Sequence, residues 1–448
     1  MPGWARRRRP TRPRPSNRKQ PGDLQQHASA PGQGSRLGSI LALLASVLLL
    51  TAGTNLQGVL LPIRRQLDGS GMQQVGLLSS GWSLGFVLAC IVIGRLVSAV
   101  GHVRCFAGLA AVSGAASSLL LPINNETAWI VLRVIIGFCF GGLSIITESW
   151  LNERSGTAQR GGIFAAYMTV TLLASIMGTL SLAVLNPMDA LPYTLMSVAV
   201  VLSIVPITLT PAPAPKPVKP FTIQLGALYR VSPSGVVGCF GVGLVSGAIG
   251  GLLPAYGLAM GLSTPAVAVL LAVASAGGAL GYYPVGALSD RIDRRKVTVA
   301  LACLAAACSV VLLVGPALAP LPVMIGLFGF FQFPLYGLCV ATTNDRVREQ
   351  SYSEVASELL ILYGTGTVLG PLLAVPLMHY GAANLFLFTA IMLAALAAFI
   401  GFRMFQTPEA LPEHKRRQQS LAAAHSAIWM YGPDAGAAIE ERIAADDT

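Results

Sequence analysis

Apolar residues in this chain are gathered into long blocks that short polar segments separate. Each block holds roughly twenty residues, the length that a helix rising ~1.5 Å per residue needs to cross the ~30 Å hydrocarbon layer of a bilayer. Twelve such blocks occur, at about 38–62, 75–99, 103–123, 128–150, 162–186, 190–210, 233–257, 264–288, 297–315, 321–343, 355–378 and 383–405. Glycine and proline are frequent inside the blocks, as in packed membrane helices. The pattern predicts an all-α polytopic membrane protein with twelve transmembrane helices.

The second half of the sequence repeats short phrases of the first half at a fixed offset of 192 residues. The matched pairs are Gly94 and Gly286, Gly137-Phe138 and Gly329-Phe330, Asn152-Glu153-Arg154 and Asn344-Asp345-Arg346, and Gly178 and Gly370. A membrane protein built twice on one plan encloses a cavity between its halves, and such cavities usually serve the movement of solutes. The repeat therefore predicts two six-helix bundles with a shared cavity.

The longest polar segment inside the chain, 211–232, falls between the sixth and seventh blocks. Its alternating prolines from Pro211 to Pro220 favour an extended spacer. The expected organisation is a disordered basic tail (1–36), an N-terminal six-helix bundle (37–210), a Pro-rich linker (211–232), a C-terminal six-helix bundle (233–405) and a polar tail (406–448).

The charge distribution predicts the orientation in the membrane. Charged residues make up only 11% of the chain, and residues 1–36 alone supply +8 of the net charge of +11. With both termini in the cytoplasm, 27 of the 30 Lys and Arg lie inside, Arg64 and Arg65 lie outside, and Arg133 lies in the membrane. This asymmetry favours cytoplasmic termini. The basic tail suits nucleic acid or anionic lipid, but a disordered cytoplasmic tail is the simpler explanation, so the bilayer is expected as a partner and nucleic acid is not.

The segment after the eighth block carries a glycine, an acid and a basic cluster: Gly286, Asp290, Arg291 and Arg294. A glycine lets two helices approach, and a carboxylate four residues later can reach the N-terminus of a neighbouring helix. The basic residues would hold the loop at the lipid headgroups. The segment resembles the G-x-x-x-D-R-x-G-R-R loop signature of the major facilitator superfamily.

The corresponding loop after the second block keeps Gly94, Gly101 and Arg104. It has Ser98 where the acid is expected and Ala99 where the first basic residue is expected. In the superfamily this loop acts as a latch that stabilises one conformation. The resemblance therefore implies cytoplasmic gating loops in both halves, with a weaker latch in the first; a basic loop that serves membrane topology alone is the alternative.

The fourth block carries two ionisable residues on one helical face. Arg133, Gly137, Gly141, Ser144 and Glu148 fall within about 80° of one another on a helix. The segment resembles the R-x-x-x-G-x-x-x-G pattern in the fourth helix of the superfamily. A charge facing lipid costs ~2.5–3.5 kcal/mol or more, so both residues should face protein or water. They are ~22 Å apart along the axis, too far to pair.

The roles of these two residues remain open at the sequence level. Arg133 serves either substrate binding or proton coupling, or it ties helices together. Glu148 serves the same coupling, or it completes the loop latch near the inner end of the helix. Other polar candidates for the cavity are Tyr167 and Thr171 on one face of the fifth block, Gln332 and Tyr336 on one face of the tenth, and either Asn55 or Gln57 in the first.

Two further segments resemble one branch of the superfamily, the YcaD-like predicted bacterial transporters. These are Thr147–Met168 and Gly329–Tyr336. The resemblance implies a multi-pass protein of the cytoplasmic (inner) membrane that moves a small-molecule solute by alternating access, by default as a monomer. The modest polarity of the cavity candidates favours a small or amphipathic solute, including an anionic one, over a sugar.

The remaining chemistry bears on the alternatives. No G-x-x-x-x-G-K-[ST] phosphate-binding segment occurs, so a gradient, most simply of protons, would drive uphill movement without a cofactor. The five histidines lie in loops or tails and the seven cysteines form no C-x-x-C pair, which argues against a metal site or a membrane enzyme. A non-transporting receptor or scaffold and a multidrug exporter stay as alternatives. The antiporter signature of the fifth helix is missing, since Gly178 is followed by Thr179, which disfavours the exporter.

Overall fold

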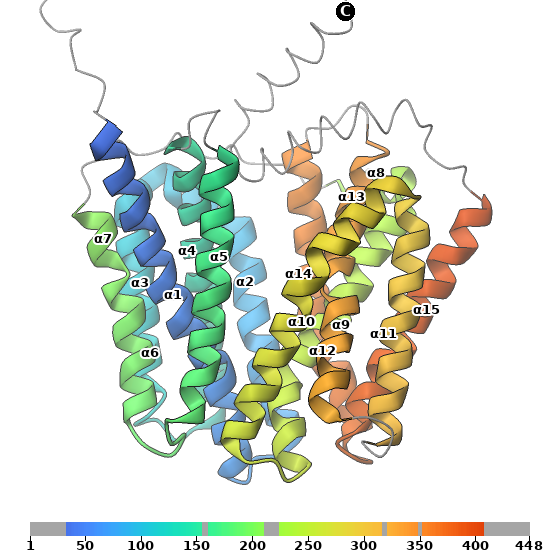
Figure 1. Cartoon of the computed structure of the whole chain (residues 1–448). Coiled ribbons are helices and arrows are strands. Elements are labelled where there is room, and N and C mark those ends of the chain that lie inside the picture. Colours follow the sequence, from blue (N-terminus) through green and yellow to red (C-terminus); the bar gives the residue numbers. More distant parts are fainter. Residues whose placement is uncertain (1–32, 155–159, 210–223, 316–319, 348–351, 407–448) are drawn as a thin grey trace, which may run out of the picture.

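The apolar blocks fold as long helices that run back and forth across one layer. The computed structural model describes residues 33–154, 160–209, 224–315, 320–347 and 352–406. The predicted N-terminal tail, most of the linker and the C-terminal tail therefore lie outside the described residues. Figure 1 shows the helices standing side by side, with α1 beginning and α15 ending at the same edge of the layer. We call this edge the tail side and the opposite edge the far side.

Each predicted block coincides with helical structure. In the first half these are α1 (Gln33–Leu67), α2 (Met72–Val100), α3 (His102–Leu119), α4 (Glu126–Arg154), α5 (Arg160–Leu180) with the 3₁₀ turn η1 (Ser181–Ala183), and α6 (Leu191–Leu202) with α7 (Ile204–Thr208). In the second half these are α9 (Pro233–Ala259), α10 (Thr264–Arg291), α11 (Arg294–Val314), α12 (Leu321–Gln332) with α13 (Pro334–Asn344), α14 (Tyr352–Met378) and α15 (Asn384–Gln406). Among the described residues, 11 helices are long and apolar enough to cross a membrane. The block at 103–123 forms α3, which is shorter and is not one of these 11.

Two helices depart from a simple span. Inside the expected linker, Leu225–Val231 form the short helix α8. The tenth block is divided into α12 and α13 at Phe333, because Pro334 has no amide hydrogen to continue the helical ladder. The division places Gln332 at the end of one helix and Tyr336 in the first turn of the next.

The 192-residue repeat is visible in the closest helix packing. Three pairs of glycines, each pair 192 residues apart, lie against backbone carbonyl groups of a neighbouring helix. The carbonyl groups that the two glycines of a pair contact are also 192 residues apart. A methyl group on any of these glycines would collide with the backbone. The equivalent contacts are Gly85 on Val134 and Gly277 on Gly326, Gly137 on Trp82 and Gly329 on Ala274, and Gly178 on Ala52 and Gly370 on Leu244. The α2–α4 and α1–α5 pairs of the first half therefore pack like the α10–α12 and α9–α14 pairs of the second.

The two halves meet along α2 and α14 in the part of the layer nearer the far side. Gly76 packs on Val375 near the far end. The Ser80 hydroxyl donates a 2.7 Å hydrogen bond to the Val368 carbonyl. Gly364 packs against Val87, which lies ~16 Å from Gly76 along α2 in the direction of the tail side. Val267 at the start of α10 is also buried among residues of α1 and α4.

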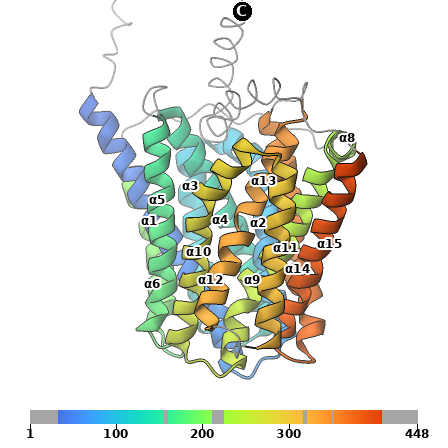
Figure 2. The ribbon, with the colours of Figure 1, turned by 45° about the vertical axis from the view of Figure 1, so that its right-hand side comes forward.

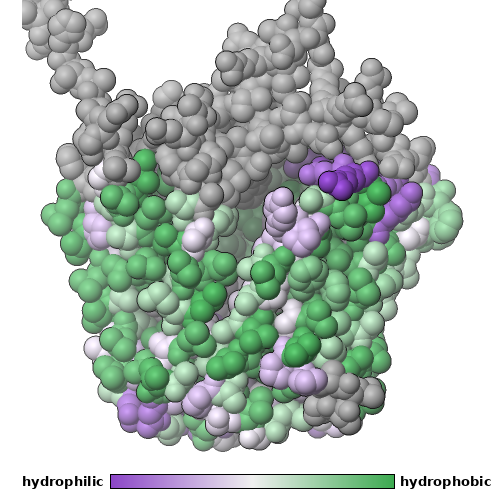
Figure 3. All heavy atoms as spheres, viewed as in Figure 1, coloured by the Kyte–Doolittle hydropathy of each residue, from purple (hydrophilic) through white to green (hydrophobic). Residues whose placement is uncertain are grey.

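Toward the tail side the halves part. Figures 1 and 2 both show α10 leaning away from α5 as it rises toward the tails. Figure 3 shows an apolar belt around the helices, with polar residues near its two edges and a hollow between the halves that opens toward the tail side. The fold is thus an all-helical membrane protein that is closed at the far side and open at the tail side.

Candidate functional site

Arg133 lies inside the N-terminal half, in the part of α4 nearer the far side. Its side chain is buried, its Nε donates to the Leu78 carbonyl at 3.2 Å, and its Nη1 donates to Gln57 Oε1 at 3.3 Å. The guanidinium also lies 6.0 Å from the centroid of the Trp82 ring. The arginine therefore does not face lipid; its contacts join α1, α2 and α4.

Glu148 lies ~22 Å from Arg133 along the same helix, in the half of the layer that is open to the tail side. The Tyr167 hydroxyl on α5 donates to Glu148 Oε1 at 3.1 Å. Among the described residues no Lys, Arg or His lies within ion-pair distance of this carboxylate. The Cys90 thiol on α2 is its other titratable neighbour. Glu148 is partly exposed, and its carboxylate has no cationic partner among the side chains that the structure describes.

An aromatic cluster lies between these two ionisable residues. The Trp82 ring stacks on Phe86 with centroids 5.8 Å apart, and Phe140 from α4 packs on Trp82 at 5.5 Å. Trp82, Phe86 and Cys90 follow one another at intervals of four residues, so they lie on one face of α2. The Trp82, Phe86 and Phe140 rings are all partly exposed. This face forms an aromatic wall on the N-terminal half.

The facing wall on the C-terminal half carries neutral polar groups. Gln332 is fully buried, and its Nε2 donates to Ser246 Oγ on α9 at 2.8 Å, while within the described part of the chain its Oε1 accepts no hydrogen bond. The Tyr336 and Tyr363 rings, from α13 and α14, pack with centroids 4.6 Å apart. Tyr336 is close enough to Cys90 to interact electrostatically, so the two walls face each other.

The structure therefore brings some of the predicted residues together and separates others. Glu148 and Tyr336 are partly exposed, whereas Tyr167 is buried and packs with Val47 and Leu151 inside the N-terminal half. Gln57 is buried within the N-terminal half, where its Nε2 donates to Ser117 Oγ at 3.0 Å in addition to its contact with Arg133. Asn55, on another face of α1, donates to Ser175 Oγ on α5 at 3.2 Å. Thr171 lies one turn beyond Tyr167 on α5.

The predicted latch of the second half is built as an ion-pair network. Arg294 at the start of α11 is buried, with Nη1 2.8 Å from Asp345 Oδ1 and Nη2 3.2 Å from Asp290 Oδ1. Asp293 caps the same helix through the Arg295 amide. The loop is thereby joined to the end of α13, whereas the exposed Arg291 has no ion pair of 4.0 Å or less within the described structure.

The loop of the first half is built differently. The position equivalent to Arg294 is His102, which is buried beside Trp150 and whose Nε2 has no hydrogen-bond partner among the described residues. Ser98 bonds only back to the Arg95 carbonyl of its own helix at 2.8 Å, and Arg104 is exposed. Gly101 adopts φ +90° between α2 and α3, a conformation that favours glycine.

One expectation about these loops is wrong in this structure. Gly94 and Gly286 were expected to allow close helix approach, yet nothing lies within 4 Å of a methyl group placed on either one. The reason is their position: both lie near the tail-side ends of α2 and α10, where the halves have parted. The close approach occurs instead at the glycines of the repeat deeper in the layer.

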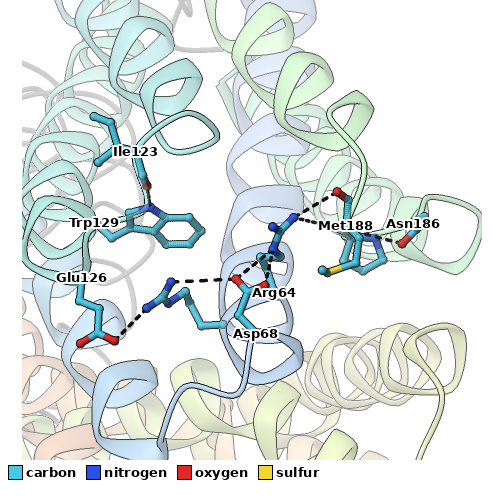
Figure 4. A network of polar contacts seen from close by, with 9 residues as sticks. Arg64, Asp68, Ile123, Glu126, Trp129, Asn186 and Met188 are labelled. Carbon is cyan, nitrogen blue, oxygen red and sulfur yellow. Dashed lines mark hydrogen bonds and ion pairs between the residues drawn. The ribbon is translucent and has the colours of Figure 1, made fainter.

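A second polar network closes the far end of the N-terminal half. Figure 4 shows Glu126 and Trp129 near Asp68 and Arg64. Arg65 pairs with Glu126, with Nη2 and Oε1 3.2 Å apart, and its guanidinium lies 5.0 Å from the Trp129 ring centroid. Arg64 pairs with Asp68 at 3.0 Å. These residues line a pocket of about 520 Å³. Their charges balance one another, so the network ties together the ends of α1 and α4.

Several of these residues escape sequence reasoning. The aromatic wall and Ser246 carry no charge and belong to no motif. Glu358 on α14 is a buried acid within an apolar block, and the sequence pattern did not identify it as a candidate. Its carboxylate accepts a hydrogen bond from the Gln224 amide at 2.8 Å. Asp345 belongs to a repeated phrase, so its 192-residue partner could have drawn attention to it. The offset alone does not say that it pairs with Arg294.

Two helical bundles of one plan, with polar groups on facing walls that open to one side, define a membrane transporter of the two-bundle type. The chain matches the family model described as Major Facilitator Superfamily over residues 43–357 and 236–433. It belongs to that superfamily and is a secondary transporter, not an enzyme.

Curated relatives place it near the expected branch. It is 28% identical to an uncharacterized MFS-type transporter of Enterobacter sp. (strain 638) over 368 residues, covering 80% of this chain and 93% of the relative. It is 26% identical to the uncharacterized MFS-type transporter YcaD of Escherichia fergusonii over 351 residues, covering 77% and 90%.

Solved structures share the fold at low sequence identity. A bacterial homologue of the human lysosomal transporter Spinster, inward-facing and occupied, aligns with TM-score 0.69 at 16% identity, covering 85% of this chain and 99% of that one. The nucleoside transporter NupG aligns with TM-score 0.65 at 12% identity, covering 84% and 100%. A D-xylose-proton symporter aligns with TM-score 0.64 at 12% identity, covering 83% and 98%.

Proposed function

We propose that the protein is a proton-coupled transporter of a small solute across the cytoplasmic membrane, with both termini in the cytoplasm. The tail side is then the cytoplasmic side, and the structure represents an inward-open state. The excess of basic residues in the tail-side loops supports this orientation, while Arg64 and Arg65 lie in the last turn of α1, at the far side.

The observation that carries the proposal is the environment of Glu148. A carboxylate in low-polarity surroundings is costly unless it is neutralised, and the described residues offer it only the Tyr167 hydroxyl as a direct partner. It is therefore suited to take up a proton when the cavity faces one side and release it when the cavity faces the other. One solved structure that shares the fold is a D-xylose-proton symporter, which is compatible with such coupling.

Arg133 has a positioning role in this proposal. It holds α2 against α4 through the Leu78 carbonyl and supports the Trp82 ring. The gating loops around Asp290 and Arg294 stabilise the tail-side end of the C-terminal half, and Gly94, Gly101 and Arg104 form the weaker counterpart.

Proteoliposomes containing the full chain and a pH indicator test the function. A panel of solutes, added under an imposed pH gradient, should include one that changes the internal pH and accumulates inside the vesicles. Glu148→Gln should abolish the coupled proton movement, whereas Asp189→Asn, which changes an exposed far-side carboxylate, should leave it intact. Solute accumulation that is indifferent to the pH gradient would contradict proton coupling.

The same vesicles address the receptor or scaffold alternative. Deleting residues 1–32 and 407–448 removes both tails and leaves the helices in place. A transporter should still move the solute, whereas a scaffold that acts through its tails would show no solute movement with or without them.

A further inference from the structure

The cavity shows an imbalance of charge. Arg133 is a basic residue deep within the N-terminal spans, and its guanidinium is buried against the Leu78 carbonyl, Gln57 and Trp82. The groups that contact its positive charge therefore all belong to the N-terminal half. Glu148, in contrast, is partly exposed at the opening and has no cationic partner among the described residues. The ionisable side chain that we place at the cavity is therefore an acid, neutral with its proton and negative without it.

The walls around this carboxylate are aromatic on both sides. Trp82, Phe86 and Phe140 form a contiguous cluster with centroids 5.5–6.5 Å apart. Across the opening, Tyr336 and Tyr363 form a second pair at 4.6 Å. Gly364, the neighbour of Tyr363, touches Val87, the neighbour of Phe86, so the two clusters lie at the same level. Ring faces attract cations and also accept apolar groups.

We propose, on the basis of the transporter function above, that the solute is an organic cation with an aromatic or apolar body. Its body lies between the two aromatic walls, and its positive charge lies against the Glu148 carboxylate. The assignment agrees with the small or amphipathic solute that the modest polarity of the cavity candidates favours, and it selects a cation where the sequence also admitted an anion.

The assignment has a consequence for coupling. The carboxylate in this surrounding is neutralised either by a proton or by the solute, and it cannot hold both. Binding of the cation therefore displaces one proton from Glu148 to water, and protonation displaces the cation. Among the side chains that the structure describes, the titratable groups packed around Glu148 are Tyr167 on α5 and Cys90 on α2, whose ordinary pKa values leave both neutral near pH 7. Solute and proton thus move in exchange.

A pair of probes with the same shape and opposite charge tests the inference. Tetraphenylphosphonium and tetraphenylborate are titrated into the full-length protein in detergent, with binding followed by tryptophan fluorescence and proton release by a pH indicator. Tetraphenylphosphonium should bind at least tenfold more tightly than tetraphenylborate. It should release about one proton per bound cation, and its affinity should fall as the pH is lowered.

Variants identify the groups involved. Glu148→Gln should weaken tetraphenylphosphonium binding at least tenfold and abolish proton release, and Phe140→Ala should weaken binding while leaving proton release per bound cation unchanged. Asp189→Asn should match the unmodified protein. Helicity and elution volume in size-exclusion chromatography establish that each variant is folded. A variant that fails this check is replaced by Glu148→Asn, which also removes the carboxylate, or by Phe140→Leu, and the same directions are expected.

The outcomes separate this inference from the function on which it rests. Equal or tighter binding of tetraphenylborate, or unchanged tetraphenylphosphonium binding by Glu148→Gln, would overturn the assignment of a cation. Absence of tetraphenylphosphonium binding, together with solute-driven proton flux in vesicles, would overturn it while leaving the proton-coupled transporter standing. Cation binding with proton release but no flux of any solute would instead count against transport.

Discussion

Arg294 at the start of α11 and Asp345 at the end of α13 form an ion pair of 2.8 Å in which both side chains are nearly buried. The pair joins the predicted gating loop to the repeated phrase Asn344-Asp345-Arg346. At the equivalent positions the first half has His102 and Glu153. The two halves thus share backbone packing but differ in the chemistry that fastens their tail-side ends.

Breaking this pair from one side should destabilise the protein markedly. Asp345→Asn leaves the Arg294 guanidinium buried with Asp290 as its remaining carboxylate, and loss of one partner of a buried pair costs ~3–5 kcal/mol. Thermal unfolding in detergent should show a clear fall in the midpoint temperature. Asp290→Asn, at a carboxylate with 57% of its side chain exposed, should cost ~1 kcal/mol or less. Equal losses from the two variants would show that the Asp345 contact has no special weight.

The loop of the first half should respond to pH. Burial lowers the pKa of His102 below its usual value of 6.5, so the neutral ring is favoured in the folded protein. The unfolded chain then binds more protons between the two pKa values, and stability decreases as the pH falls below about 6.5. The unfolding midpoint should therefore drop between pH 7.5 and pH 5.5. In His102→Gln this part of the pH dependence should disappear; a drop of the same size in the variant would assign it to other groups.

The glycines of the repeat give a matched test of packing. Gly85→Ala and Gly277→Ala each drive a methyl group into a backbone carbonyl of the neighbouring helix, so both should destabilise by ~1–3 kcal/mol. Gly94→Ala and Gly286→Ala face open space, and alanine is the better helix former by ~1 kcal/mol. These two should be neutral or stabilising in thermal unfolding. A similar loss at all four positions would mean that helix packing is not what distinguishes them.

Much of the fold could be predicted because the membrane imposes simple rules. Block length fixed the helices, and the fixed offset indicated two equivalent bundles, which the contacts of Gly178 and Gly370 confirm. The division of the tenth span follows from Pro334 but was not anticipated, since a proline in a membrane helix can also be tolerated as a kink.

The candidate site was less accessible to sequence reasoning. Charge in an apolar block drew attention to Arg133 and Glu148, and helical periodicity correctly placed them on one face and too far apart to pair. Periodicity does not reveal which neighbouring helix a face meets, so the burial of Arg133 behind Trp82 and its contact with Gln57 came only from the structure. Aromatic residues such as Phe140 are common in every membrane helix, and only their grouping marks them.

In an alternating-access cycle, the contact between α2 and α14 at the far side must break so that the cavity can open there. Ser80 and Val368 lie on opposite halves at the closed far side, joined by a 2.7 Å hydrogen bond. In a chain whose native cysteines are replaced by serine or alanine, Ser80→Cys with Val368→Cys should be joined by a short thiol cross-linker. Because the far side then cannot open, transport in vesicles should fall to background and return when a cleavable linker is reduced.

Ser118→Cys with Ser197→Cys provides the matched control, since these hydroxyls are 2.7 Å apart within one half and need not separate. Cross-linking of this control should leave transport intact; undiminished transport with the Ser80–Val368 cross-link in place would rule out the opening of the far side as a step of the cycle.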